Sequence, residues 1–181
     1  DAIGTNNMKF TAYAKRDEGA LEEELECEIR LGHLSQDGKK FTAGVEQDFF
    51  NRVYQMLEKQ PTRNYFNPEE VSINMRNEFI IKSRQFKDSK ERLDITKSVQ
   101  TGEKTKNVII KQKIRQHEQR LSLGDASGYS VRFSFAWEVQ SKTKPSTLAV
   151  RADYFERVKK RRSFVLSTIV IDMTEVETKN V

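Results

Sequence analysis

The sequence contains few of the residues that build disulfides, zinc sites or flexible linkers. It has one cysteine, Cys27, two histidines, three prolines and eight glycines among 181 residues. One cysteine excludes an internal disulfide and a cysteine-built zinc site, and it is typical of a reducing intracellular compartment. No apolar run reaches the roughly 18 residues of a membrane-spanning helix, so we expect no membrane partner. Because no linker or low-complexity tract is visible, residues 1–181 are expected to form a single domain.

Charged residues are abundant by contrast. They make up 33% of the chain against 36% for hydrophobic residues, and the formal net charge is +5. An exterior alone rarely needs so many charges, so some of them should line an interior surface. The basic balance favours anionic partners such as nucleic acid, nucleotides or polyphosphate, although a merely soluble surface would have the same composition.

The apolar periodicity predicts a short strand at Met8–Ala14, then one main helix and a series of strands. Residues Thr42–Gln60 have apolar side chains at helical spacing, and Pro61 ends the pattern. Lys142–Ser146 is expected to be a loop. The period is two in seven later segments, namely Val71–Arg76, Glu78–Lys87, Glu91–Lys97, Lys106–Arg115, Tyr129–Gln140, Phe155–Leu166 and Ile169–Glu177. This pattern predicts a β-rich α+β fold built on an antiparallel sheet or barrel.

Segment Ala20–Gly32 is ambiguous. As a strand it places Glu24, Glu26 and Glu28 on one face. Its leucines and isoleucine are also spaced as on a helix, and glutamate and leucine favour helices. The residues themselves therefore leave strand and helix open.

Like charges gather on one face of two segments. Phe155–Leu166, read as a strand, aligns Arg157, Lys159 and Arg161, as Ala20–Gly32 aligns its glutamates. Carboxylates suit hard cations such as Mg²⁺ or Mn²⁺, whereas guanidinium and ammonium groups suit phosphate oxygens. A closed barrel with a hydrated, charged interior would explain both clusters, because charges are too costly to bury dry.

Three stretches, in order along the chain, resemble one enzyme family. Glu26–Gly32 (ECEIRLG) is similar to an acidic strand E-x-E-x-[RK]-x-G, and Arg157–Ser163 (RVKKRRS) to a basic strand R-x-K-x-R-x-S. Ile171–Val176 (IDMTEV) is similar to I-D-[LIM]-T-x-V. These are motifs of the tunnel-type, metal-dependent RNA 5′-triphosphatases of the fungal, protozoan and viral mRNA-capping apparatus. The resemblance favours a strand at Ala20–Gly32 and implies an eight-stranded antiparallel β-barrel with few supporting helices.

The resemblance also implies roles for individual residues. Metal ligands for Mg²⁺ or Mn²⁺ would be Glu26 and Glu28. The triphosphate would be bound by Arg92, Lys113, Arg132, Arg157, Lys159 and Arg161. Glu138 would orient or deprotonate the attacking water, Arg132 and Asp172 would brace the tunnel wall, and Cys27 would face outward. Implied partners are a 5′-triphosphate RNA end, nucleoside triphosphates and an RNA guanylyltransferase, and the implied location is the nucleus, or the cytoplasm for a viral protein.

The chain departs from the family pattern near its end. Family members carry a second acidic strand, E-x-E-x-E, shortly after the I-D-x-T strand, and Glu175 and Glu177 do not replace it. We expect that the natural chain continues beyond Val181 with this acidic strand, or that the strand has been lost from this sequence. Targeting segments before Asp1 would be missing from it in the same way. Arg30 is expected to be an ordinary surface or wall charge.

Two other functions fit the same residues. One is a tunnel enzyme that acts on inorganic tripolyphosphate, thiamine triphosphate or free nucleotides. The other is a non-enzymatic basic β-barrel that binds RNA. Aromatic residues on a basic sheet face would favour that binding protein. In the predicted strand Tyr129–Gln140, however, the aromatic residues are on one face and Arg132 and Glu138 on the other, which argues against it.

Overall fold

The computed structural model describes residues 3–15, 23–60, 73, 75–113, 118–124, 128–166 and 169–179. Within these ranges the chain forms ten strands and two helices, and the strands belong to one antiparallel sheet. None of the helices in these ranges is both long and apolar enough to cross a membrane.

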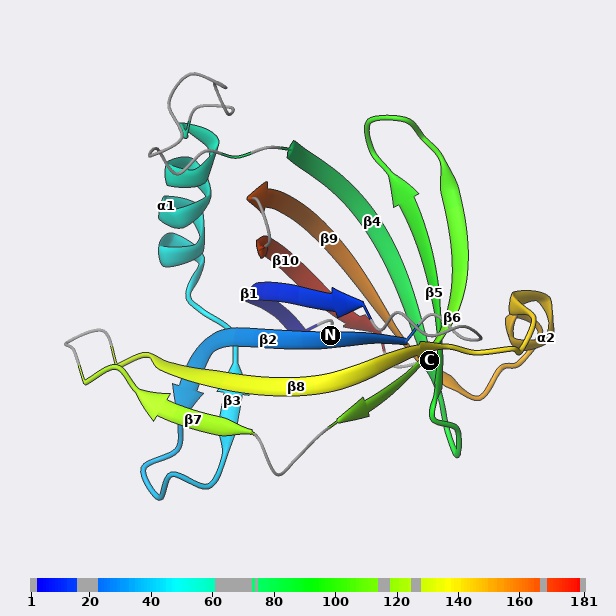
Figure 1. The fold of residues 1–181 in the computed structure, drawn as a ribbon, viewed down its shortest axis with the longest axis horizontal. Helices are drawn as coiled ribbons and strands as arrows, with labels where there is room; N and C mark the ends of the chain where they lie inside the picture. Colours follow the sequence, from blue (N-terminus) through cyan, green and yellow to red (C-terminus); the bar gives the residue numbers. More distant parts are fainter. Residues whose placement is uncertain are drawn as a thin grey trace.

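Eight of the strands close into a barrel (Figure 1). In order around the barrel they are β2 (Glu23–Leu34), β1 (Ile3–Lys15), β10 (Ile169–Lys179), β9 (Tyr154–Leu166), β4 (Met75–Phe86), β5 (Glu91–Ser98), β6 (Lys104–Lys113) and β8 (Ser130–Gln140). Pairing of β8 with β2 completes the ring. Two short strands, β3 (Phe41–Ala43) and β7 (Gln119–Ser122), extend the sheet beside β2 and β8.

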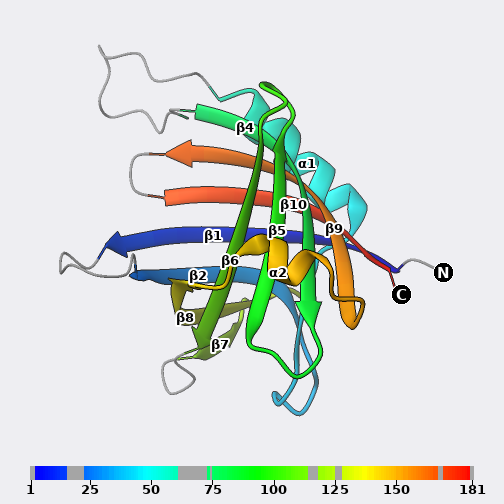
Figure 2. The ribbon, with the colours of Figure 1, turned by 90° about the vertical axis from the view of Figure 1, so that its right-hand side faces the viewer.

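The apolar cores lie outside this ring. Helix α1 (Gln47–Glu58) packs through Phe50 and Leu57 against the outward face of β1, β9 and β10, where Met8, Phe164 and Met173 are buried. Helix α2 (Pro145–Ala149) lies across β5 and β6, as Figure 2 shows, and a second buried cluster forms there from Phe86, Leu93, Val108 and Leu148. Because side chains alternate along a strand, the residues between these apolar positions point into the barrel.

The strand register confirms the predicted faces. On β9 and β10, the outward residues include Phe164, Ile171 and Met173, which are buried in the outer core, while Asp172 and Ser163 face each other on the other side. Cys27 lies opposite Phe135 on the outward face of β2 and β8, as predicted. Trp137 shares that face, is half-buried and belongs to neither apolar cluster.

Most of the predicted elements are present with shifted ends. The eight-stranded antiparallel barrel is confirmed, and the ambiguous glutamate segment is a strand, because β1 and β8 pair with it on both sides. The predicted helix is shorter at its start, since residues Phe41–Ala43 pair with β2 instead. The expected loop at Lys142–Ser146 runs into α2, which has Pro145 in its first turn. Most of the predicted strand Val71–Arg76 lies outside the described residues.

Candidate functional site: a charged tunnel inside the barrel

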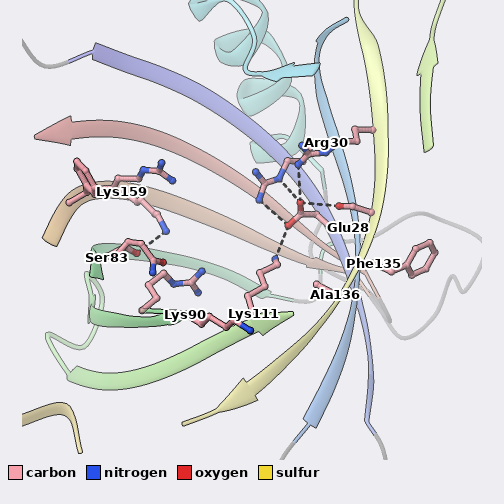
Figure 3. Close-up of a pocket in the computed structure, with 14 residues that line it drawn as sticks. Glu28, Arg30, Ser83, Lys90, Lys111, Phe135, Ala136 and Lys159 are labelled. Carbon is pink, nitrogen blue, oxygen red and sulfur yellow. Dashed lines mark hydrogen bonds and ion pairs between the residues drawn. The ribbon is translucent and has the colours of Figure 1, made fainter. Parts of the chain in front are cut away.

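Two adjoining cavities lie inside the barrel. Their volumes are about 450 Å³ and 190 Å³, and Arg30, Arg92, Lys111 and Lys159 line both of them. We refer to the two cavities together as the tunnel. Figure 3 shows side chains from β2, β4, β6 and β9 pointing into the larger cavity, whereas Phe135 points away from it.

The tunnel is lined mainly by cations. Its basic side chains are Lys9, Arg30, Lys90, Arg92, Lys111, Arg132, Arg157, Lys159 and Arg161. Its carboxylates are Glu26, Glu28, Asp94 and Glu138. Nine potential positive charges therefore meet four negative ones, an excess that favours an anion inside the tunnel.

The two central glutamates of β2 are buried among cations. Glu26 is 1% exposed and Glu28 is 3% exposed. Lys9 Nζ lies 2.6 Å from Glu26 and 3.5 Å from Glu28, and Arg30 Nε lies 2.5 Å from Glu28. Burial disfavours ionisation, but Arg30, Lys9 and Lys111 outweigh it and hold the pKa of Glu28 at about 2. Lys9 and Lys111 likewise lower the pKa of Glu26 despite its burial.

Lys111 of β6 lies among three carboxylates. Its Nζ donates a hydrogen bond to Glu26 and lies 3.4 Å from both Glu28 and Glu138. Burial alone would lower the pKa of Lys111, but Glu26 and Glu28 raise it, so this side chain stays protonated. The dashed line from Lys111 to Glu28 in Figure 3 marks one of these ion pairs.

The carboxylates around Lys111 are candidate ligands for a divalent ion. Among the described residues, no group of three or more His, Cys, Asp or Glu side chains could hold a metal ion as it stands. Glu26, Glu28 and Glu138 nevertheless converge on one cation, the Lys111 ammonium. Carboxylates so placed have the chemistry that a hard divalent ion requires, so the donor set fits Mg²⁺ or Mn²⁺ once the ammonium is displaced.

The basic strand β9 has fewer countercharges. Arg157 is exposed and forms no ion pair with any described residue, and Lys159 Nζ donates to the neutral hydroxyl of Ser83 at 2.8 Å. Arg161 lies 3.3 Å from Asp172, whose other oxygen accepts a hydrogen bond from Ser163 at 2.6 Å. We call Arg157, Lys159 and Arg161 the basic row.

Lys159 is held in an unusual electrostatic environment. Burial and the neighbouring cations Arg92, Arg161 and Arg157 lower the pKa of Lys159 to about 7, although Asp94 acts in the opposite direction. Asp94 is itself occupied, because it accepts hydrogen bonds from Ser83 at 2.5 Å and from Arg92 at 2.9 Å. An anion in the tunnel would supply the countercharge that Lys159 lacks.

Three arginines that line the tunnel also have an unsatisfied guanidinium nitrogen. Within the described part of the chain, Nε of Arg30, Arg132 and Arg161 has no hydrogen-bond partner, and neither has Nε of Arg76, which lines neither cavity. The guanidinium carbon of Arg132 also lies 5.1 Å from the centre of the Phe41 ring. Buried donors without partners are rare in folded proteins, so these atoms point to a ligand with acceptor oxygens.

The structure brings most of the residues predicted for the site together. Lining the tunnel are Glu26, Glu28, Arg92, Arg132, Glu138, Arg157, Lys159 and Arg161. Asp172 is 4% exposed and does not line either cavity, so its position fits the predicted bracing role through Arg161 and Ser163. The side chain of Lys113, like that of Glu24, lies outside the described residues.

Sequence reasoning missed several tunnel residues. Arg30 was expected as a surface or wall charge on the strand face of Glu26 and Glu28; it is a wall charge that lines both cavities, and only its contact with Glu28 was not predicted. Lys9, Lys111, Ser83 and Asp94 gave no local signal, because nothing in the sequence of their strands distinguishes them from the other polar residues there.

Comparisons with known proteins identify the fold. No family model matches the sequence, and no curated protein matches it either. The structure of the Schizosaccharomyces pombe Pct1 RNA triphosphatase is similar over 97% of this chain and 69% of that one, with a TM-score of 0.51 and 11% identity. Its structure in complex with the Spt5 CTD is similar over the same shares, with a TM-score of 0.50 and 12% identity. The chain therefore has the triphosphate tunnel fold, a closed eight-stranded antiparallel barrel, at a sequence identity that shows the fold alone.

Proposed function

We propose that this chain is a tunnel-type triphosphatase that removes the terminal phosphate from a 5′-triphosphate RNA end. The observation that carries the proposal is the excess of cations inside the barrel, and above all the basic row, whose charges are incompletely matched. A triphosphate is a compact, highly charged anion with many acceptor oxygens. It would match the unsatisfied donors of Arg132 and Arg161 and the unmatched charge of Lys159.

The cations would bind and orient the triphosphate. Arg157, at the exposed end of the basic row, meets the anion first, and Lys159 and Arg161 follow it inward. Arg92 and Arg132 bind from β5 and β8, and Lys113 is proposed to contribute from the end of β6. Positive groups held in place before the reaction stabilise the charge that spreads over the transferred phosphoryl oxygens.

Glu138 is the proposed base. It lies in the smaller cavity, 4.0 Å from Arg92 and 3.4 Å from Lys111. Lys111, and no cation of the basic row, is its partner in the β6–β8 ladder. In this role Glu138 accepts a proton from the attacking water as the water oxygen bonds to the terminal phosphorus. The bridging oxygen leaves with its electron pair on the diphosphate end. Asp172 positions Arg161 without touching the substrate.

Glu26 and Glu28 are the residues that would hold Mg²⁺ or Mn²⁺. When bound, such an ion would neutralise phosphate charge and polarise the transferred group. The chain's own contribution is to keep both carboxylates ionised, which the pKa of about 2 of Glu28 and the lowered pKa of Glu26 ensure at neutral pH.

The test of hydrolysis is phosphate release from triphosphate-ended RNA in the presence of Mn²⁺ or Mg²⁺. We expect Glu138→Gln to lower the rate by about 100-fold or more while tripolyphosphate still binds, because only the proton acceptor is lost. Glu156→Gln on the outward face of β9 is the matched control and should keep the activity. Release that continues at the wild-type rate in Glu138→Gln, or without any divalent ion, would contradict the proposed mechanism.

The biological substrate is proposed to be nascent mRNA, with nucleoside triphosphates as secondary substrates. A capping role would place the protein in the nucleus, or in the cytoplasm for a viral protein, beside an RNA guanylyltransferase. Rates on triphosphate-ended RNA and on inorganic tripolyphosphate, measured side by side, test this. A rate on tripolyphosphate that exceeds the rate on RNA would assign the chain to small polyphosphates instead. Tight RNA binding without any release would identify a binding protein.

A further inference from the structure

The structure contains two cations that no catalytic role has yet used. Lys9 of β1 and Lys111 of β6 both bind the carboxylates of β2 from inside the tunnel. Lys9 is in the tunnel because β1 closes the barrel between β2 and β10, where it places a lysine beside Glu26 and Glu28. Their side chains are 14% and 22% exposed, so neither is sealed within the wall.

We infer that Lys9 and Lys111 are exchangeable counter-ions, which neutralise Glu26 and Glu28 in the free protein and transfer to phosphate oxygens when a triphosphate enters. The inference rests on the proposed function. The two carboxylates can then bind a divalent ion only as the anion arrives and takes over the ammonium groups. The two ammonium groups thereby make metal binding depend on the presence of the triphosphate.

Electrostatics supports this order of events. Two ammonium groups balance the two carboxylate charges, and Arg30 adds a third positive charge at Glu28. A divalent ion added to this cluster would meet cations already within contact distance of its ligands. A triphosphate reverses the sign of the local charge, because it supplies several negative charges beside the ammonium groups.

Lysine is chemically suited to such an exchange. Its ammonium is a point charge on a flexible four-carbon stem with three donors, so it can change partners without movement of the backbone. The planar guanidinium of Arg30 donates one hydrogen bond of 3.0 Å to Glu28 and has its Nε 2.5 Å from the other carboxylate oxygen, so it would keep the carboxylate oriented meanwhile.

A buried hydroxyl lies beside the carboxylates. Thr11 is opposite Glu28 in the β1–β2 ladder and therefore shares its inward face. It is 1% exposed, and its Oγ1 has no hydrogen-bond partner in the described part of the chain. The wall next to Glu28 therefore has an unmet polar atom as well as the exchangeable ammonium groups.

The experiment measures Mn²⁺ binding by electron paramagnetic resonance with protein alone, because tripolyphosphate itself chelates Mn²⁺ in solution. We expect Lys111→Met and Lys9→Met each to bind Mn²⁺ about tenfold or more tightly than the wild type, as the competing ammonium is removed. Lys111→Arg keeps the charge and should bind as weakly as the wild type. Adding Glu28→Gln to Lys111→Met should remove the gain.

Lys90→Met is the matched control. Lys90 also lines the larger cavity but forms no ion pair with a described carboxylate, so its loss should leave Mn²⁺ binding unchanged. If Lys9→Met and Lys111→Met are folded and bind Mn²⁺ no better than the wild type, the inference is overturned.

Equilibrium dialysis against tripolyphosphate with a chelator present separates the two proposals. The wild type should bind the anion without metal, and Lys9→Met and Lys111→Met should bind it about tenfold more weakly, because each has lost a phosphate contact. A folded wild type that fails to bind tripolyphosphate would refute the proposed function itself. Wild-type anion affinity in both variants would refute only the transfer of the lysines.

Discussion

The acidic cluster of β2 and the basic row of β9 line the same tunnel, but in the part of the chain that the structure describes the acidic charges have ion-pair partners and most of the basic ones do not. Glu26 and Glu28 each have ammonium partners, and Glu28 has a guanidinium as well. In the basic row, Arg157 has no ion-pair partner among the described residues and Lys159 has only a hydroxyl. The first region uses its charges to hold the barrel together, whereas the second leaves them available for a ligand at a cost in stability.

The largest effect should come from breaking the matched region. Glu28→Gln removes a buried carboxylate and leaves Lys9, Arg30 and Lys111 with too little countercharge. We expect it to lower the free energy of unfolding by about 3 kcal/mol, since breaking a buried ion pair from one side leaves an uncompensated charge. Urea unfolding monitored by circular dichroism would measure the loss.

The outer ion pair between Arg84 and Glu156 serves as the control. It is 2.9 Å long and joins β4 and β9 on the outward face of the barrel. Glu156→Gln should cost about 1 kcal/mol or less, because this pair is more exposed and stands outside the charge cluster. Equal losses at the two positions would show that the acidic cluster is not specially matched.

A gain in stability is expected from neutralising the unmatched region. Lys159→Met removes a buried ammonium whose pKa of about 7 records the cost of its charge. We expect the free energy of unfolding to rise by about 1 to 3 kcal/mol at pH 6, with allowance for water in the tunnel. The same variant should lose affinity for tripolyphosphate, which separates stability from binding.

The gain should shrink as the pH rises. Below pH 7 Lys159 is protonated in the folded and unfolded chains, so the folded protein bears the full cost of the charge. Between about pH 7 and the ordinary lysine pKa of 10.5, only the unfolded chain keeps the proton, and wild-type stability increases with pH. The difference in the free energy of unfolding between variant and wild type should therefore be larger at pH 6 than at pH 9. A gain that grows with pH would contradict the assignment.

Anion binding should depend on the same proton. Because Lys159 loses its charge above pH 7 in the free protein, the wild type must take up a proton to bind tripolyphosphate with full affinity. We expect its affinity to fall by up to about tenfold between pH 6 and pH 8.5, which corresponds to about 1.4 kcal/mol. Tripolyphosphate also titrates in this range, so the slope for Lys159→Met gives the contribution of the anion. Parallel slopes for the two proteins would exclude Lys159 as the titrating group.

The periodic pattern predicted an antiparallel sheet or barrel, and the family resemblance implied the closed barrel of eight strands. Charges at every second residue of β2 and β9, with apolar residues between them, show which face is inward before any partner strand is known. Read as strands, the two segments have Glu26 and Glu28 on one face and the basic row on one face. Periodicity could not decide whether the glutamate segment was a strand or a helix; the resemblance favoured a strand, and pairing with β1 and β8 shows it.

The charge matching between strands was beyond the reach of periodicity. Lys111 contacts carboxylates on β2 and β8 through barrel closure, and nothing in the local sequence of β6 distinguishes it from Lys113. The same holds for Lys9, because the segment around it is an ordinary alternating strand in the sequence. Only the position of β1 between β2 and β10 in the barrel places Lys9 beside the carboxylates of β2. Contacts across the ring, not motifs, determine which cations are matched.

The smallest effect should be at the exposed end of the basic row. Arg157 lines the larger cavity but is exposed, so solvent and salt screen its charge. We expect Arg157→Ala to weaken tripolyphosphate binding by only about threefold at low salt, mainly through slower association, and by less as salt increases. Arg162→Ala, which removes an outward cation paired with Glu78, is the matched control and should leave binding unchanged. Stopped-flow measurements over a salt series would test this. A loss from Arg157→Ala that is large and independent of salt would mean that Arg157 holds the anion as firmly as Lys159 and Arg161, and that the whole basic row acts as one site.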